Sequence, residues 1–333
     1  MNLPAARTRR QAPFIAWFAK GYDQNSKRAQ FIKIAFLFLG GLFLVFILIE
    51  LWQGIRYSVW DGKRQLTFVF EQENRLGYIK INKELDEVKV LTLSDNVMVP
   101  LAYGYQEYKA NKVKLLAKQE KLPLGPFLSV SFTHFLGTVT DGYVTEAKGI
   151  IPNPSLLLRQ ALARKAKTNF TDWDLIRLLF YLANIRSEQV EYIDLSDTSS
   201  FQYTVLPDGS EVYQPDLNKL DSFVLVELAN PQFLNQTYTW EVFNGTQHPG
   251  LGNQVKRIVA NSGFTVVGVR QALSFYETSF ISLGKRVEKA ESVKEFACYL
   301  DIPTKKGTEL NDRADVVLVI GEDYWKRYLQ REN

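Results

Sequence analysis

Cysteine and histidine are almost missing from this chain. Its 333 residues contain one cysteine, Cys298, and two histidines, His134 and His248. A disulfide framework needs paired cysteines, and a zinc site or a Ser-His-Asp triad needs several such side chains at set spacing. Neither histidine has a second ligand or base at such spacing, and Cys298 falls in the helical pattern VEKAESVKEFACYLDI, which favours a small core residue. We therefore expect a fold held by its core, without a disulfide, a metal site or a cysteine nucleophile.

Excess positive charge is absent from most of the chain, although the isoelectric point is about 8.9. Of 40 basic and 36 acidic residues, seven basic residues and one acid lie within residues 1–33, which leaves 33 basic and 35 acidic residues for the rest. A nucleic-acid-binding domain carries a basic patch on its folded part. We therefore predict no nucleic-acid partner.

One long uncharged run stands out at residues 34–49, IAFLFLGGLFLVFILI. A bilayer core needs about 20 apolar residues in a helix, and the flanking residues extend this run far enough. We predict a transmembrane helix at 31–53 that acts as an uncleaved signal-anchor. A cleaved signal peptide is the alternative, but the run begins late and no small-residue cleavage site follows it.

The basic tail at 1–30 predicts the topology of this single-pass protein. Positive charge that flanks a span stays in the cytoplasm. The tail is therefore expected to lie in the cytoplasm and the domains after the helix outside the cell. This topology places the protein in the cell membrane, with membrane lipid as a partner.

Strand and helix patterns alternate after the apolar run. Thr171 predicts a helix start, because Asp174 stands at the third position of the first turn. The apolar runs at 127–136 and 220–228 fit either a helix or a strand. Other helices are predicted at 156–167, 253–261 and 287–300. Strands are predicted at 66–70, 78–81, 88–93, 142–146, 190–195, 237–242, 265–269, 278–283 and 315–320, the second and third of these as a hairpin, and a tight hairpin turn is predicted at 206–209.

This alternation predicts an α/β fold class with two domains after the anchor. The first domain is expected at 63–230 and a smaller α/β domain at 236–326. The Asn230-Pro231 step supplies the boundary between them.

The second domain resembles the C-terminal domain of LytR-type cell-envelope proteins. The resemblance depends on VFNGT at 242–246, PGL at 249–251, GFTVV at 263–267, ADVVLVIG at 314–321 and DY at 323–324, in that order. The Asn-Gly step permits a tight turn, and the N terminus of the following helix could hold an anion. A purely structural turn is the other interpretation, and it is the one we favour. The candidate binding residues are Asn244, Gly245, Thr246 and Gly250.

The first domain resembles the LytR-CpsA-Psr domain more faintly. The matching features are the strand at 66–70, VKVLTLSDNVMVP at 88–100, Lys109-Ala110-Asn111, DGYV at 141–144, Arg159-Gln160 and IDLS at 193–196. This resemblance implies an α/β/α sandwich. It also implies membrane-anchored enzymes that transfer polyprenyl-pyrophosphate-linked glycopolymers onto peptidoglycan.

The departures from the family pattern predict a degenerate domain. Where the family has an arginine and an aspartate, this sequence has Asp95 and Asn96. An acid repels phosphate, and an asparagine supplies no charge to a metal. The segment before Arg159 that carries further arginines in the family is almost absent. The remaining candidates for contact with a phosphate or another ligand are Lys109, Asn111, Arg159 and Gln160.

We therefore expect a non-catalytic envelope protein without a cofactor. It would bind a cell-wall polymer, a lipid-linked precursor or an envelope protein, and Tyr103, Tyr105 and Tyr108 could stack on sugars or pack internally. The alternative is an active glycopolymer phosphotransferase that uses Mg²⁺. A signalling or division-complex subunit acting through the tail is a third possibility.

Overall fold

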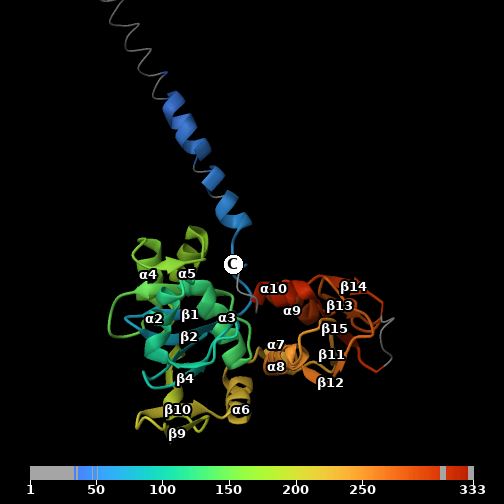
Figure 1. Ribbon diagram of the computed structural model, residues 1–333. Coiled ribbons are helices and arrows are strands. Elements are labelled where there is room, and N and C mark those ends of the chain that lie inside the picture. Colours follow the sequence, from blue (N-terminus) through green and yellow to red (C-terminus); the bar gives the residue numbers. More distant parts are fainter. Residues whose placement is uncertain (1–33, 35–36, 47, 51, 308–312, 329–333) are drawn as a thin grey trace, which may run out of the picture. The chain divides into compact units, whose positions relative to one another are not determined.

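The computed structural model describes residues 34, 37–46, 48–50, 52–307 and 313–328 (Figure 1). The predicted basic tail lies outside the described residues. The chain divides into two compact units, residues 1–57 and 58–333. The first unit contains a 20-residue helix, Leu37–Arg56, whose mean hydropathy of 2.0 makes it long and apolar enough to cross a membrane.

The second unit contains a six-stranded sheet in the order β7-β6-β1-β2-β3-β8. β1, β2 and β3 are consecutive antiparallel strands, whereas β6 and β8 join the sheet in parallel with β1 and β3. The predicted hairpin is therefore confirmed. The strands span Leu66–Gln72 (β1), Arg75–Asn82 (β2), Glu87–Thr92 (β3), Gly142–Ala147 (β6), Lys167–Thr168 (β7) and Val190–Asp194 (β8).

Helices cover both faces of this sheet, which confirms the predicted α/β class. Side chains such as Tyr78 and Leu91 pack against α2 (Val113–Gln119), α3 (Leu124–Leu136) and α6 (Leu217–Glu227). On the other face, Phe68 and Ile79 pack with α4 (Pro154–Leu162) and α5 (Asp172–Asn184). Both runs that the sequence left open are helices, α3 and α6. Most of α3 is buried, which removes the polar face that would have identified it as a helix.

The predicted helix start at Thr171 is confirmed. The Thr171 side chain accepts a hydrogen bond from the Asp174 amide, and the Asp174 carboxylate accepts one from the Thr171 amide. By contrast, α4 ends at Leu162 instead of continuing to residue 167 as predicted. Arg164 has a left-handed φ of 58°, and the residues after it form β7, which pairs with β6.

Short elements connect the main layers. β4 and β5 form a small antiparallel pair, and β9 and β10 form a hairpin around the predicted turn at 206–209. These elements span Met98–Pro100 (β4), Glu107–Lys109 (β5), Ala110–Lys112 (η1), Ser187–Gln189 (η2), Leu195–Asp197 (η3), Phe201–Val205 (β9) and Glu211–Pro215 (β10).

A second sheet has the order β12-β11-β15-β13-β14 and is covered on one face by helices around Trp240 and Phe296. Cys298 is exposed on α9, so its predicted place in the core is wrong; the buried face of α9 passes through Val293 and Phe296 instead. The elements are Pro231–Leu234 (α7), Thr239–Asn244 (β11), Leu251–Asn261 (α8), Thr265–Gln271 (β12), Phe280–Leu283 (β13), Glu291–Leu300 (α9), Thr304–Lys306 (β14), Val316–Ile320 (β15) and Glu322–Tyr328 (α10).

The C-terminal end of α3 is capped by side chains of α8. Arg257 donates to the carbonyl oxygens of His134 at 2.6 Å and Phe135 at 2.9 Å, and Asn261 donates to that of Leu136 at 3.1 Å. Both side chains also bond to Asp221 of α6. Helix ends leave carbonyl groups without partners inside the helix, so these contacts satisfy them. Burial, with Arg257 nearby, lowers the pKa of His134 to about 4.

Lys80 on β2 is only 3% exposed and donates to the carbonyl oxygens of Glu227 at 3.0 Å and Ala229 at 3.2 Å. Burial lowers its pKa to about 8, although Glu87 and Glu227 oppose the shift. Between pH 8 and 10 the unfolded chain therefore binds more protons at this lysine than the folded chain. Stability rises with pH wherever the unfolded state binds more protons.

We expect the free energy of unfolding to rise by about 2 kcal/mol between pH 7.5 and 9.5 through this lysine alone. Denaturant unfolding at both pH values measures the change. Lys80→Met should remove this pH dependence of the free energy of unfolding. The control Lys83→Met, at an exposed position nearby, should retain it. An equal rise in the wild type and in Lys80→Met would contradict the assignment.

Candidate functional site

Two polar hollows adjoin at the end of the first sheet where β3 and β8 terminate. Their volumes are about 390 and 410 Å³, and Arg75 and Asp95 line both. We call them together the edge hollow. The first is also lined by Glu73, Asn74, Asn111, Lys112, Gly149 and Ile150, and the second by Phe70, Gln72, Thr92, Leu93, Ser94, Pro152 and Asp194.

The antiparallel pairing of β2 and β3 brings Arg75 to this place. β2 begins where β3 ends, with Gly77 paired to Thr92 and the Leu93 amide bonded to the Leu76 carbonyl at 3.1 Å. The turn before β2 is tight, because Glu73 and Asn74 both have left-handed φ values, 50° and 69°. Arg75 then donates to the carbonyl oxygen of Ile150 at 3.2 Å, and both residues line the first hollow.

The carboxylates of the edge hollow outnumber its cations. The lining contains three acids, Glu73, Asp95 and Asp194, and two basic residues, Arg75 and Lys112. The net charge of the lining is therefore −1 when all five side chains are ionised. Asp194 is partly satisfied by protein groups: it accepts from the Ser196 amide at 2.9 Å and the Ser196 hydroxyl at 2.7 Å. Asp95 is an exposed turn residue. A lining of this sign disfavours a pyrophosphate group.

A buried acid holds the wall of the edge hollow in place. Glu71 is fully buried, and Lys114 donates to it at 2.8 Å. The same carboxylate accepts from the amides of Asn74 at 2.8 Å and Glu146 at 2.7 Å. Because its oxygens are used by these three donors, Glu71 shapes the β1–β2 turn and the end of β6.

The structure brings together two of the six candidates predicted in this domain. Asp95 and Asn111 line the edge hollow, and the Asn111 amide donates to the Asp95 carbonyl at 3.3 Å. Asn96 and Lys109 lie outside this lining. The Asn96 carbonyl accepts from the Tyr213 amide. Hydrogen bonds from Ser210, with a smaller contribution from the charge of Lys109, lower the pKa of Asp208.

The other two candidates lie on α4. Arg159 is exposed on the helix surface, outside the lining of the edge hollow. Gln160 bonds to both backbone groups of Lys148, accepting from its amide at 2.8 Å and donating to its carbonyl at 2.7 Å. Gln160 therefore fixes the loop between β6 and α4.

The three tyrosines proposed as sugar platforms pack against the core instead of standing free. Tyr103 and Tyr105 lie 5.8 and 5.9 Å from the ring of Phe127, centroid to centroid. Tyr105 also donates to Glu120 at 2.9 Å, and Tyr108 is only partly exposed. Packing of the three side chains against the core explains their position without a ligand.

The candidate loop of the second domain consists of Asn244, Gly245, Thr246 and Gly250, and it is braced by its own side chains. Asn244 accepts from the Thr246 amide at 3.1 Å and hydroxyl at 2.7 Å, and donates to the His248 carbonyl at 2.9 Å. A side chain at Gly245 would meet Tyr276 at 2.7 Å. Gly250 caps α8 with a left-handed φ of 82°. These contacts support the alternative of a structural turn.

Sequence reasoning missed Arg75, Ser94, Lys112 and Asp194 in the edge hollow. A signal for Arg75 was present, because a residue that opens the second strand of a hairpin lies beside the end of the following antiparallel strand. Asp194 was part of the IDLS motif but was interpreted only as the end of a strand. Its proximity to Ser94, at 3.4 Å, depends on the parallel pairing of β3 and β8.

The second sheet and its helices carry the predicted motifs in the predicted order. Residues 237–324 match the family described as LytR cell envelope-related transcriptional attenuator. The resemblance of this part of the chain to LytR-type proteins is therefore confirmed. Comparison with curated protein sequences finds no match.

Several solved structures are similar to about half of the chain. TagT of Bacillus subtilis has 11% identity and a TM-score of 0.37 over 49% of this chain and 89% of its own. TagV of the same organism has 14% identity and a TM-score of 0.35 over 48% of this chain and 94% of its own. A structure titled "TagT bound to LIIa-WTA" has 12% identity and a TM-score of 0.35 over 49% and 89%.

Proposed function

We propose that this protein is a membrane-anchored, extracytoplasmic protein of the cell envelope that binds an envelope component without catalysing phosphoryl transfer. The anchor would be the helix Leu37–Arg56, whose length and hydropathy suit a bilayer. The LytR-type domain at 237–324 supports a role in the envelope. The bound component would be a cell-wall polymer, a lipid-linked precursor or an envelope protein.

The net negative charge of the edge hollow is the observation that supports the absence of catalysis in this proposal. Phosphoryl transfer needs cations around the transferred group. Here Asp95 stands where the LytR-CpsA-Psr motif has an arginine, and it lines the hollow together with Glu73 and Asp194. Arg159, the arginine that the motif retained, lies outside this lining.

The second candidate function is an active glycopolymer phosphotransferase, favoured by the position of Arg75 between the two hollows. Mg²⁺ binds through one or two carboxylates together with substrate phosphates and water. Asp95 and Asp194 would supply the carboxylates, and Mg²⁺ would screen the charge of a pyrophosphate. Arg75 would then bind the phosphate directly.

A charge reversal tests the two functions. The full-length protein in nanodiscs is incubated with a polyprenyl-pyrophosphate-linked glycan and Mg²⁺, and release of the polyprenyl phosphate is measured. We expect none from the wild type. Asp95→Arg changes the lining charge from −1 to +1. It should strengthen binding of inorganic pyrophosphate, measured by calorimetry, by about tenfold.

Asn96→Arg is the matched control, because it places the same side chain one residue further along and outside the edge hollow. It should leave pyrophosphate binding close to the wild-type level. Transfer by the wild type that is lost in Arg75→Ala would establish the phosphotransferase. Cosedimentation of the wild type with peptidoglycan sacculi measures polymer binding directly.

A further inference from the structure

The outer face of α5 carries apolar side chains that lie outside the core. Trp173, Ile176 and Phe180 are spaced three and four residues apart, so they share one face of the helix. Phe180 is 70% exposed and Ile176 is 38% exposed. The opposite face supplies the buried residues Leu175, Leu178 and Leu182 to the core. An aromatic side chain this exposed on a helix suits contact with another apolar phase.

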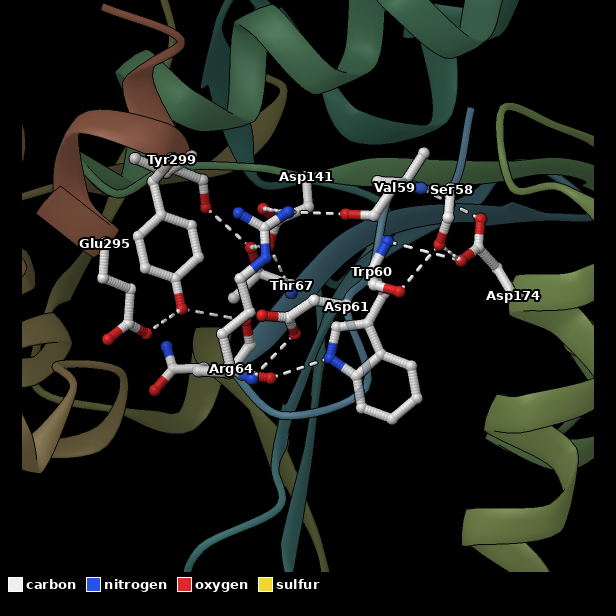
Figure 2. A network of polar contacts seen from close by, with 12 residues as sticks. Ser58, Val59, Trp60, Asp61, Arg64, Thr67, Asp141, Asp174, Glu295 and Tyr299 are labelled. Atoms are coloured by element: carbon white, nitrogen blue, oxygen red, sulfur yellow. Dashed lines mark hydrogen bonds and ion pairs between the residues drawn. The ribbon is translucent and has the colours of Figure 1, made fainter. Parts of the chain in front are cut away.

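The first residues of the second unit are bonded to the same helix. The Asp174 carboxylate accepts hydrogen bonds from the Ser58 hydroxyl, the Val59 amide at 3.0 Å and the Trp60 amide at 3.3 Å (Figure 2). Asp174 is fully buried in the first turn of α5. The chain therefore enters the folded unit at the N terminus of this helix.

Arg177 joins the entering segment to the outer face of α5. Its guanidinium lies 5.3 Å from the ring of Trp60 and 5.8 Å from the ring of Trp173. Its own position on the helix, between Ile176 and Phe180, places a cation among the apolar side chains. A cation beside aromatic rings is the composition that suits the lipid headgroup region, where phosphates meet the acyl chains.

The connection to the apolar helix is very short. Ser58 follows Arg56, the last residue of Leu37–Arg56, by two positions. An extended chain covers about 3.5 Å per residue. Ser58 therefore lies within about 7 Å of Arg56, where the apolar helix ends. If that helix crosses the bilayer, the N terminus of α5 must lie close to the outer headgroups.

We propose that the face of α5 formed by Trp173, Ile176, Arg177 and Phe180 rests on the outer headgroup region of the bilayer. This inference depends on the proposed membrane anchoring and adds a second, non-spanning contact with the same membrane. The apolar side chains gain by leaving water, and Arg177 gains a phosphate partner. The contact would fix the orientation of the first domain above the membrane.

Fluorescence quenching by lipids tests this contact in the full-length protein. Cys298, the single cysteine, is replaced by serine, and one new cysteine is introduced for an NBD label. The labelled positions are Phe180→Cys on α5, Val226→Cys on α6 as the control, and Leu44→Cys in the apolar helix. Val226 is 77% exposed and matches Phe180 in accessibility. Each variant is placed in nanodiscs with and without doxyl-labelled lipid.

We expect NBD at 44 to be strongly quenched, NBD at 180 to lose about half of its fluorescence with a blue-shifted emission, and NBD at 226 to be unaffected. Quenching at 44 with none at 180 would overturn the α5 contact and leave the anchoring intact. Equal quenching at 180 and 226 would also overturn it, because the contact would not be specific to this face. No quenching at 44 would instead refute the anchoring. Ile176→Cys repeats the test on the same face.

Discussion

Replacement of Asp174 by alanine is expected to lower the free energy of unfolding by about 4 kcal/mol, a fall in melting temperature of about 10 °C. The buried carboxylate accepts from Ser58, Val59 and Trp60 (Figure 2). It also closes the helix cap with Thr171. Alanine loses the cap, and it leaves the buried Trp60 amide and the partly buried Val59 and Thr171 amides without this acceptor. Thermal and denaturant unfolding of the full-length protein measure the change.

Asp172→Ala is the control for this prediction. Asp172 lies in the same first turn but forms an exposed pair with Arg164 at 2.8 Å. Exposed ion pairs contribute little, so a loss below about 1 kcal/mol is expected. Similar losses in the two variants would show that Asp174 acts only through the general charge at the helix N terminus.

Replacement of Phe296 by alanine is expected to cost the C-terminal domain about 4 kcal/mol. Phe296 is fully buried, and its ring lies 5.0 Å from that of Phe264, 5.5 Å from that of Trp240 and 5.9 Å from that of Phe233. Alanine would remove three edge-to-face contacts and leave a cavity among aromatic rings that are too rigid to fill it. Near-ultraviolet circular dichroism during denaturation follows the loss.

Phe275→Ala provides the comparison within the same domain. Its side chain is 54% exposed, and an exposed substitution changes stability by about 0.5 kcal/mol or less. A small effect at Phe296 as well would mean that the domain's stability does not depend on this aromatic cluster.

Local sequence patterns were enough to predict the elements that are formed by residues close together in the chain. The Thr171 cap was predictable because its two partners are three residues apart, and the hairpin of β2 and β3 because both strands and their turn are adjacent. The order of short motifs from 242 to 324 was enough to indicate the LytR-type domain, which the family match confirms.

The arrangement of the edge hollow could be predicted only in part. Asp95 and Asn111 were candidates on the strength of a motif, and they do lie together. Their neighbours Arg75 and Asp194 come from other strands, and they reach the hollow only because β2 and β8 pair on either side of β3. The lining charge, on which the proposed function depends, is a sum over side chains from these two strands, two turns and η1.

The sequence alone determined the apolar helix, the α/β class and the C-terminal family, because composition, periodicity and adjacent motifs encode them directly. Only the tertiary structure decided that Asp174 holds residues more than a hundred positions earlier and that Arg257 caps α3. Such contacts join single side chains to distant backbone groups. They leave no repeating pattern in the chain, since each depends on how whole layers pack.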